Sequence, residues 1–223
     1  MSRKAVPLTL DHLEALDAPC RGCVFWELDP VRRARLGAGA DAVSEKEAWI
    51  SHVLREWGSC GRVLLVDGRP VGYATYAPPA YVPGAEGFAT APVSPDAVLL
   101  TALWVQRTHA GGGLGRILVQ AMARDLITRG GIRAVEAFGE RRGPGPRRAD
   151  HQCVVPADFL GRVGFKTQRP HPHTPRMRME LRSALTWRDE VEAAIGRLVG
   201  VVRPEKTPSP APKATRDRTP GTA

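Results

Sequence analysis

Residues 97–129, AVLLTALWVQRTHAGGGLGRILVQAMARDLITR, decide the fold that we expect for this chain. Their first nine residues, AVLLTALWV, form an unbroken apolar run of the length of a buried strand. After a turn, apolar residues recur at helical spacing from Leu114 to Leu126, and Gly130-Gly131 follows as a stop signal. The segment therefore predicts a buried strand, a glycine-rich turn and a helix with one apolar face.

The turn at residues 110–115, AGGGLG, is the part of this unit that could bind a ligand. Glycine lets the backbone approach a ligand closely, and the first N–H groups of a helix have no partner within the helix. These donors and the helix dipole favour a bound anion such as a pyrophosphate. A flexible turn without a ligand is the alternative. The spacing matches neither the P-loop, which needs Lys-Ser/Thr after its last glycine, nor the Rossmann fingerprint.

Shorter strands and helices flank this unit. Asp67-Gly68 separates two β-rich runs and predicts a hairpin, and Ser44 is the expected N-cap of an amphipathic helix. Residues 77–96 contain five prolines and predict a long loop. The other expected elements are strands at 62–66, 71–76, 132–138 and 176–181 and helices at 45–57 and 157–163. This order predicts an α+β fold with a mixed, mostly antiparallel sheet flanked by helices.

The C-terminal part of the chain has a different composition. Residues 203–223 hold five prolines, no aromatic residue and no aliphatic side chain larger than alanine, which predicts a disordered tail. Just before it, residues 186–202 carry apolar side chains at helical spacing, which predicts an amphipathic helix and a candidate homodimer interface. We therefore expect one domain over residues 1–202, whose N-terminal region (residues 1–61) carries a Cys-x-x-Cys pair.

Composition excludes several classes of protein. With 43% hydrophobic and 25% charged residues over 223 positions, the chain is not largely disordered. No apolar run reaches the roughly 18–20 residues of a membrane span. Four cysteines are too few for a disulfide scaffold, and the first residues lack a signal-peptide pattern, so we expect a cytoplasmic protein. Arginine far outnumbers lysine, and Ala, Gly and Pro abound, which indicates a GC-rich bacterial genome.

The basic balance of the chain favours an acidic ligand. The net charge is +9, and residues 141–148, RRGPGPRR, form a basic loop that is either solvated or in contact with such a ligand. Nucleic acid is not favoured as a partner, because no aromatic residues are interleaved with these arginines to stack on bases.

Two motifs resemble the GNAT superfamily of N-acyltransferases. Gly113 and Gly115 follow the buried strand as in the family's acyl-CoA signature, Arg/Gln-x-x-Gly-x-Gly/Ala, although the first position is Ala110 here. Residues 159–165, FLGRVGF, resemble the family's Phe-Tyr-x-Lys-x-Gly-Phe. The resemblance covers about residues 62–181. The segments around the Cys-x-x-Cys pair are similar to a cysteine-bearing bacterial subgroup of unknown substrate.

The resemblance implies an acetyltransferase that moves an acetyl group from acetyl-CoA to a primary amine on a small molecule or a protein. It also implies that the strand end, the glycine-rich turn and the start of the second motif bind the co-substrate. The implied cofactor-binding residues are Leu103, Trp104, Val105, Ala110, Gly111, Gly112, Gly113, Leu114, Gly115, Arg116 and Phe159.

Three residues are candidates for acid–base catalysis, which must deprotonate the amine and protonate the departing thiolate. The family often uses a glutamate on the central strand, but AVLLTALWV has no acid, and the nearest candidate is Glu136. The family's tyrosine acid is replaced by Leu160, which leaves Tyr73, Tyr76 and Cys153 as donors, and of these Tyr76 and Cys153 are our candidates. Near a helix start, we expect the pKa of Cys153 to be lowered. The alternatives are a solvated Glu136 that points outward and a Cys153 that is merely a small buried side chain.

The cysteines and the departures from the motif keep two other functions open. Cys20, Cys23 and Cys60 offer part of a zinc site, but complete sites usually show two Cys-x-x-Cys pairs, so we favour structural thiols and no metal. A metal or redox sensor built on these cysteines is one alternative to the enzyme. A CoA-binding regulatory module without catalysis is the other, because Ala110, Leu160 and the strand without a glutamate all depart from the family pattern.

Overall fold

The computed structural model of the chain describes residues 2–182, apart from 17, 19, 37–39 and 142–152. The predicted tail, the predicted helix at 186–202 and the basic loop beyond Arg141 lie outside the described residues, and so does the predicted domain boundary at residue 202.

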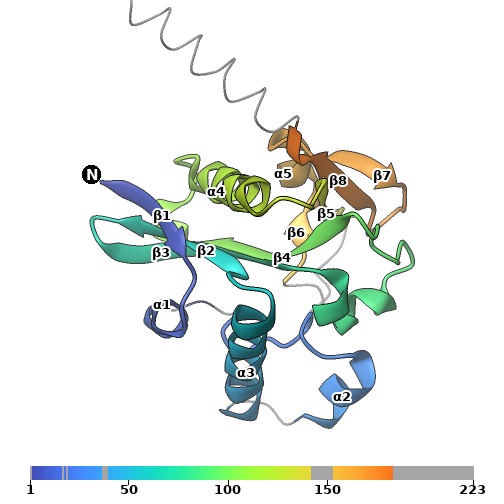
Figure 1. Cartoon of the computed structure of the whole chain (residues 1–223), viewed down its shortest axis with the longest axis horizontal. Helices are drawn as coiled ribbons and strands as arrows, with labels where there is room; N and C mark the ends of the chain where they lie inside the picture. Colours follow the sequence, from blue (N-terminus) through green and yellow to red (C-terminus); the bar gives the residue numbers. More distant parts are fainter. Residues whose placement is uncertain (1, 17, 19, 37–39, 142–152, 183–223) are drawn as a thin grey trace, which may run out of the picture. The chain divides into compact units, whose positions relative to one another are not determined.

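The described residues form one mixed sheet of eight strands (Figure 1). Its order is β1-β2-β3-β4-β5-β8-β7, and β6 pairs with β5. The parallel pairs are β4 with β5 and β5 with β6, whereas the other pairs are antiparallel, which confirms the predicted α+β class. The strands are β1 (Arg3–Pro7), β2 (Gly61–Val66), β3 (Arg69–Ala77), β4 (Ala97–Val105), β5 (Ala134–Glu140), β6 (Val155–Pro156), β7 (Lys166–Arg169) and β8 (Arg176–Glu180).

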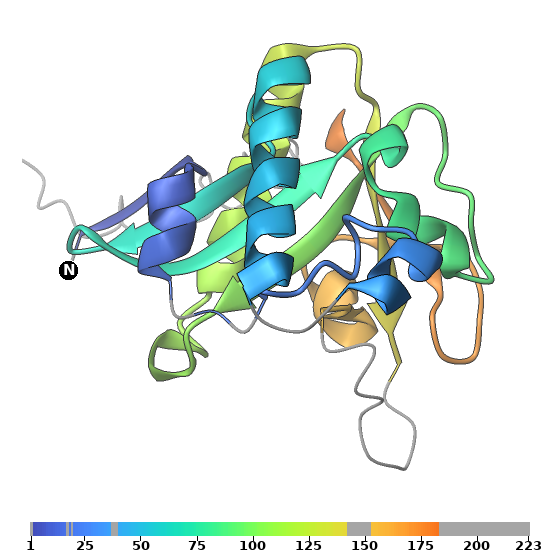
Figure 2. The same ribbon diagram turned by 90° about the horizontal axis from the view of Figure 1, so that it is seen from below.

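Helices cover both faces of this sheet. Helices α4 and α5 lie on one face and α1, α2 and α3 on the other (Figures 1 and 2). Each face has its own apolar core, and β4 contributes to both: Leu99 packs with α3, and Leu100 packs with α4. This burial explains why β4 is an unbroken apolar run. The helices are α1 (Leu10–Ala15), α2 (Pro30–Arg35), α3 (Ala40–Glu56), α4 (Leu114–Arg129) and α5 (Ala157–Arg162), with 3-10 helices η1 (Pro79–Tyr81), η2 (Pro83–Gly87) and η3 (Arg107–His109).

The predicted elements around β4 are confirmed, and one predicted cap is wrong. The hairpin turns at Asp67 and Gly68, β4 has the predicted bounds, and α4 ends immediately before Gly130. Ser44 does not cap α3, because this helix already begins at Ala40 and Ser44 lies inside it. The short elements β1, α1, α2, β6 and β7 were not predicted from the sequence.

The central strands separate at one end of the sheet. The parallel pairing of β4 with β5 runs from Ala97 with Ala134 to Leu99 with Glu136, although β4 continues to Val105 and β5 to Glu140. Beyond Phe138, β5 pairs with β6 instead. The last residues of β4 therefore have β3 on one side and an opening on the side of β5.

A β-bulge decides which way the end of β4 faces. Thr75 of β3 pairs with Ala102, but the next residue, Tyr76, pairs with Leu100, so Thr101 is an extra residue in β4. Its hydroxyl donates to the carbonyl oxygen of Thr75 at 3.0 Å. One extra residue reverses the face of the sheet to which each later side chain of the strand points. Leu103 therefore lies on the same side as Leu100 and α4.

Candidate active site

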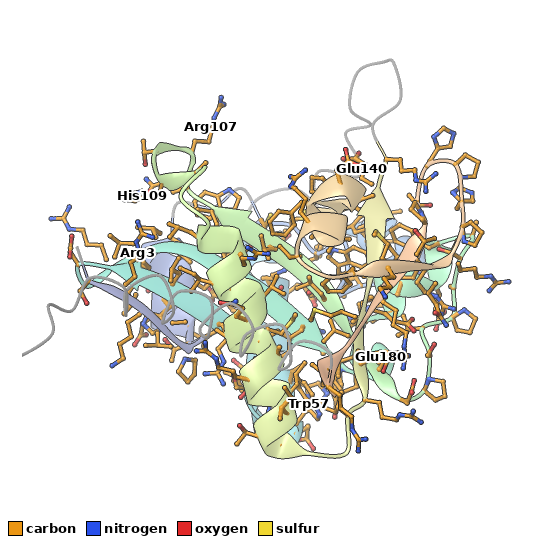
Figure 3. All side chains as sticks on the ribbon, turned by 90° about the horizontal axis from the view of Figure 1, so that it is seen from above. Arg3, Trp57, Arg107, His109, Glu140 and Glu180 are labelled. Atoms are coloured by element: carbon orange, nitrogen blue, oxygen red, sulfur yellow. The ribbon has the colours of Figure 1, made fainter. Side chains whose placement is uncertain are left out.

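A cavity of about 1050 Å³ lies where β4 and β5 separate. Its walls come from the end of β4, the glycine-rich turn, the start of α4, the end of β5, β6 and α5. Figure 3 shows Arg107 and His109 beside the turn that precedes α4, and Glu140 on the other side, near α5. The volume suits an extended ligand of the size of a nucleotide derivative.

The glycine-rich turn presents backbone donors to this cavity. Gly113 is the N-cap of α4 and lies in the left-handed region at φ 75°, and Gly111 has φ 87°. Residues other than glycine rarely adopt these backbone conformations. The N–H groups of Arg116 and Ile117 bond to the carbonyl oxygen of Gly113. The N–H groups of the two helical residues before them have no acceptor within the helix, by the geometry of a helix start. The start of α4 therefore offers backbone donors of the kind that bind anions in other proteins.

Gly115 has a packing role as well. A β-carbon at this position would lie 3.0 Å from two ring atoms of Phe159 and 3.5 Å from Leu103. The absence of a side chain thus lets α5 and β4 close around the first turn of α4. The two motifs of the sequence analysis meet at this contact.

Most of the predicted cofactor-binding residues border the cavity. All of the predicted set except Trp104 and Gly112 are among its lining residues. Trp104 faces the other side of the sheet because of the bulge, and its ring lies 6.3 Å from that of Tyr73. The carbonyl oxygen of Gly112 accepts a hydrogen bond from the Arg3 guanidinium at 3.4 Å, so β1 supports the turn from behind. Cofactor binding by these residues stays a prediction.

The sequence analysis missed several residues of the cavity. Arg116, which it did identify, is joined there by a second arginine from α5, by a histidine of η3 and by two carboxylates. Helical spacing could have found part of this set, since residues 158, 159, 162 and 163 share one face of α5. His109, interpreted from the sequence as a rim residue rather than a base, does border the cavity, and the missed lining residues are Glu140, Val155, Pro156, Asp158, Arg162 and Val163.

The predicted acid Tyr76 lies beneath α4 in the core. Its hydroxyl donates to the Asp125 carboxylate at 2.6 Å, and Asp125 also pairs with Arg62 and Arg129. Burial, together with the hydrogen bond to Asp125, raises the pKa of Tyr76. The residue is not among those that line the cavity.

The predicted base Glu136 is completely buried, so the alternative of a solvated, outward-pointing carboxylate is wrong. Its oxygens lie 3.2 Å from Arg178 and 3.4 Å from Arg176, both of β8. The backbone N–H of Ser94 donates to the same carboxylate at 3.2 Å. Arg178 and the N–H of Ser94 therefore occupy lone pairs that a base would use, and Arg176 adds a second positive charge beside them.

Cys153, a predicted proton donor, lies beside two other thiols. Its sulfur is 2.6 Å from that of Cys23 and 3.8 Å from that of Cys20. Hydrogen bonds to these two thiols raise the pKa of Cys153, so the predicted lowering is wrong. Cys153 packs against the core on the face of α3, whereas Tyr76 belongs to the core under α4. The three predicted catalytic residues thus occupy separate surroundings.

The described part of the chain shows neither a metal site nor a membrane-spanning helix. The residues there contain no group of three or more His, Cys, Asp or Glu side chains arranged to hold a metal ion. None of the helices within the described ranges is long and apolar enough to cross a membrane.

The separated central strands, the cavity and the glycine-rich start of α4 together define an acyltransferase-like architecture. The sequence profile of the Acetyltransferase (GNAT) family matches residues 15–142, more than half of the chain. The chain belongs to the GNAT acetyltransferase family. A search of curated proteins gave no significant match.

Solved structures share this fold at low sequence identity. The aminoglycoside acetyltransferase AAC(6')-Ib in complex with coenzyme A superposes with a TM-score of 0.51 at 18% identity, over 83% of this chain and 98% of that one. An N-acetyltransferase from Staphylococcus aureus Mu50 also gives a TM-score of 0.51, at 14% identity, over 81% of this chain and 99% of that one.

Proposed function

We propose that this protein transfers the acetyl group of acetyl-CoA to a primary amine on a small molecule or a protein. The observation that carries the proposal is the cavity of about 1050 Å³ with the start of α4 in its wall. The structurally similar aminoglycoside acetyltransferase AAC(6')-Ib is in complex with coenzyme A, which supports the same class of ligand here.

The residues of the cavity have separate roles in this proposal. The backbone N–H groups at residues 113–115 receive the pyrophosphate, and Arg116 and Arg162 supply positive charge at the same wall. Bound acetyl-CoA supplies the activated thioester. Leu103 and Val105 line its path along the open edge of β4, where backbone N–H groups that point away from β3 can donate to the oxyanion.

The base of this reaction is a carboxylate of β5. Glu136 is the residue that the sequence analysis identified, but two arginines and a backbone N–H hold its carboxylate. Glu140, four residues further along the strand, lines the cavity and is only half buried. We therefore favour Glu140 as the group that takes the proton of the amine, with Glu136 as a positioning residue for β5.

Calorimetric titration of the full chain with acetyl-CoA and with CoA tests the binding site. Gly112 is the best position for a variant, because its backbone is not left-handed and a β-carbon there would meet only two atoms, at 3.9 and 4.0 Å. Gly112→Glu places a negative charge in the turn, Gly112→Gln is its neutral match, and Gly87→Glu, at an exposed glycine of η2, is the charge control elsewhere. We expect Gly112→Glu alone to lose most of the affinity. Equal affinities in all variants, or no binding by the native chain, would overturn the proposal.

Turnover is tested by release of free CoA thiol over a panel of primary amines. Release that depends on both acetyl-CoA and an amine supports the transferase. The fully buried Leu160 in place of the family's tyrosine acid favours the second candidate, a CoA-binding regulatory module. Tight binding of CoA with no release over the whole panel would establish that module instead.

A further inference from the structure

Three thiols from distant parts of the sequence converge on the face of the sheet covered by α3. We call Cys20, Cys23 and Cys153 the thiol cluster. The sulfurs of Cys23 and Cys153 are 2.6 Å apart although 130 positions separate them in the chain, and the Cys153 thiol also donates to Cys20 at 3.8 Å. The cluster is separate from the residues that line the cavity.

Hydrogen bonds from surrounding residues hold the two segments of the chain that carry these thiols. The N–H of Cys23 donates to the carbonyl oxygen of Cys20 at 3.2 Å, which closes a turn. Lys46, buried in an ion pair with Glu27, donates to the carbonyl oxygen of Cys23 at 3.2 Å. Trp26 donates through its indole N–H to the carbonyl oxygen of Cys153 at 3.5 Å. The two segments that carry the thiols are therefore held together by contacts other than the sulfurs.

The thiols of the cluster differ in their protonation. The hydrogen bond from Cys153 lowers the pKa of Cys20 to about 6 and also lowers the pKa of Cys23, and the charge of Lys46 acts in the same direction. The same hydrogen bonds raise the pKa of Cys153, so Cys23 is the more readily ionised of the two thiols in contact. The cluster thus favours a thiolate, the nucleophilic form of cysteine, beside a thiol.

We propose that Cys23 and Cys153 form a reversible disulfide when the protein meets a hydroperoxide. A disulfide bond is about 2.05 Å long, so the two sulfurs need to approach by only about half an ångström. Both residues are half buried, so a small oxidant reaches them, whereas Cys20 and Cys60 are buried. The site is a modification site that does not depend on the acetyltransferase activity.

The reaction consumes one hydroperoxide for each disulfide. The Cys23 thiolate attacks an oxygen of the peroxide, the O–O bond breaks, and an alkoxide or hydroxide leaves while Cys23 becomes a sulfenic acid. The leaving anion takes the proton of Cys153. The Cys153 sulfur then attacks the Cys23 sulfur, the S–O bond breaks, and hydroxide departs and is protonated by solvent. Two electrons pass from the two sulfurs to the peroxide, and a small thiol reverses the change by exchange.

The disulfide would join the N-terminal region to the wall of the cavity. Cys153 is two residues before Val155, and both residues of β6 line the cavity. Cys23 lies in the turn that precedes Trp26, whose ring stacks on Phe88 and Phe138 in the core. Oxidation therefore connects two segments that no covalent bond holds together in the reduced protein.

Peptide mapping of the full chain tests the proposal directly. Arg21 separates the members of the Cys-x-x-Cys pair, so trypsin releases Cys20 in residues 5–21 and Cys23 in residues 22–32. Cys153 is released in residues 149–162 and Cys60 in residues 56–62. The reduced protein is treated with hydrogen peroxide, its remaining thiols are alkylated with iodoacetamide, and the digest is analysed by mass spectrometry without reduction. The expected product is residues 22–32 linked to residues 149–162, and dithiothreitol removes it.

Cysteine variants distinguish the disulfide between Cys23 and Cys153 from other disulfide pairings. Cys23→Ser and Cys153→Ser should each abolish the linked peptide, whereas Cys60→Ser, the matched control, should retain it. A link between residues 5–21 and 22–32 in the native chain would overturn the proposal, and so would complete alkylation of all four cysteines after peroxide. Because the native chain alone decides between these products, the test holds even if a variant fails to fold.

Discussion

Gly115 of α4 lies directly against the ring of Phe159 of α5, so closely that a β-carbon at residue 115 would be 3.0 Å from two of the ring's atoms. We expect Gly115→Ala to push the ring into the cavity and to weaken acetyl-CoA binding about tenfold or more, while overpacking costs about 1–2 kcal/mol of stability. Calorimetry measures the affinity and thermal unfolding the stability. Gly161→Ala, at a glycine of α5 with nothing within 4 Å, is the control. If Gly115→Ala weakens binding no more than Gly161→Ala does, the contact does not shape the site.

Glu136 and Glu140 are expected to respond differently to loss of charge. In Glu136→Gln, Arg176 and Arg178 lose the buried carboxylate between them, and breaking such a pair costs about 3 kcal/mol. The variant should therefore unfold at lower denaturant concentration. Glu140→Gln should cost less stability than Glu136→Gln, because Glu140 is only half buried at a strand end.

Turnover should show the opposite order. When only folded protein is compared, Glu140→Gln should be the slower of the two variants. If Glu140 takes the proton of the amine, kcat of Glu140→Gln falls about 100-fold and the acidic limb of the pH profile disappears. A folded Glu136→Gln protein that loses that limb, with Glu140→Gln unaffected, would make Glu136 the base.

Sequence patterns identified the centre of this fold better than its edges. AVLLTALWV is buried on both faces, so its unbroken apolar run identifies it as a strand. In contrast, β1 is an edge strand with half-exposed residues, and its sequence shows no clear alternation of apolar and polar side chains. The pairing of Glu136 with Arg178 is a cross-strand contact between β5 and β8. No local pattern shows that contact, because it depends on the register of two strands far apart in the sequence.

The same limit applies to the candidate site. The glycine-rich turn was recognisable because the requirement for positive φ and close packing is local. The bulge at Thr101, which sends Leu103 toward α4 and Trp104 to the other face, depends on how β3 pairs with β4. The approach of Cys153 to Cys23 likewise depends on packing across 130 positions.

Tyr76→Phe should affect stability and leave turnover unchanged. The change removes a buried hydrogen bond to the charged Asp125 and should cost about 2 kcal/mol. Since Tyr76 is not among the cavity residues, kcat and KM of the folded variant should match those of the native protein. Urea unfolding and steady-state kinetics on the same preparation separate the two effects. A large fall in kcat without a loss of stability would return Tyr76 to the role of acid.

Alkylation of Cys23 should begin at a lower pH than that of an ordinary thiol. The hydrogen bond with Cys153 lowers the pKa of Cys23, and this half-buried side chain is open to a small reagent. In the reduced protein, the rate of iodoacetamide labelling at residues 22–32 should therefore level off at a lower pH than it does in Cys153→Ala, where the hydrogen-bond partner is lost. Cys60, whose pKa burial raises to about 11, serves as the internal reference and should label little over the same range. Identical pH profiles for residues 22–32 in the native chain and in Cys153→Ala would contradict the prediction.

The disulfide proposed between Cys23 and Cys153 should stabilise the folded protein, because it closes a loop across 130 positions and so restricts the unfolded chain. The chain-entropy relation gives about 4–5 kcal/mol for a loop of that size when the native geometry is unstrained. Peroxide treatment should therefore raise the midpoint of thermal unfolding, and dithiothreitol should return it to the reduced value. Cys60→Ser should show the same shift, and Cys153→Ser none. A lower midpoint after oxidation, with the linked peptide present, would mean that bond formation distorts the segment before β6 more than it restricts the unfolded chain.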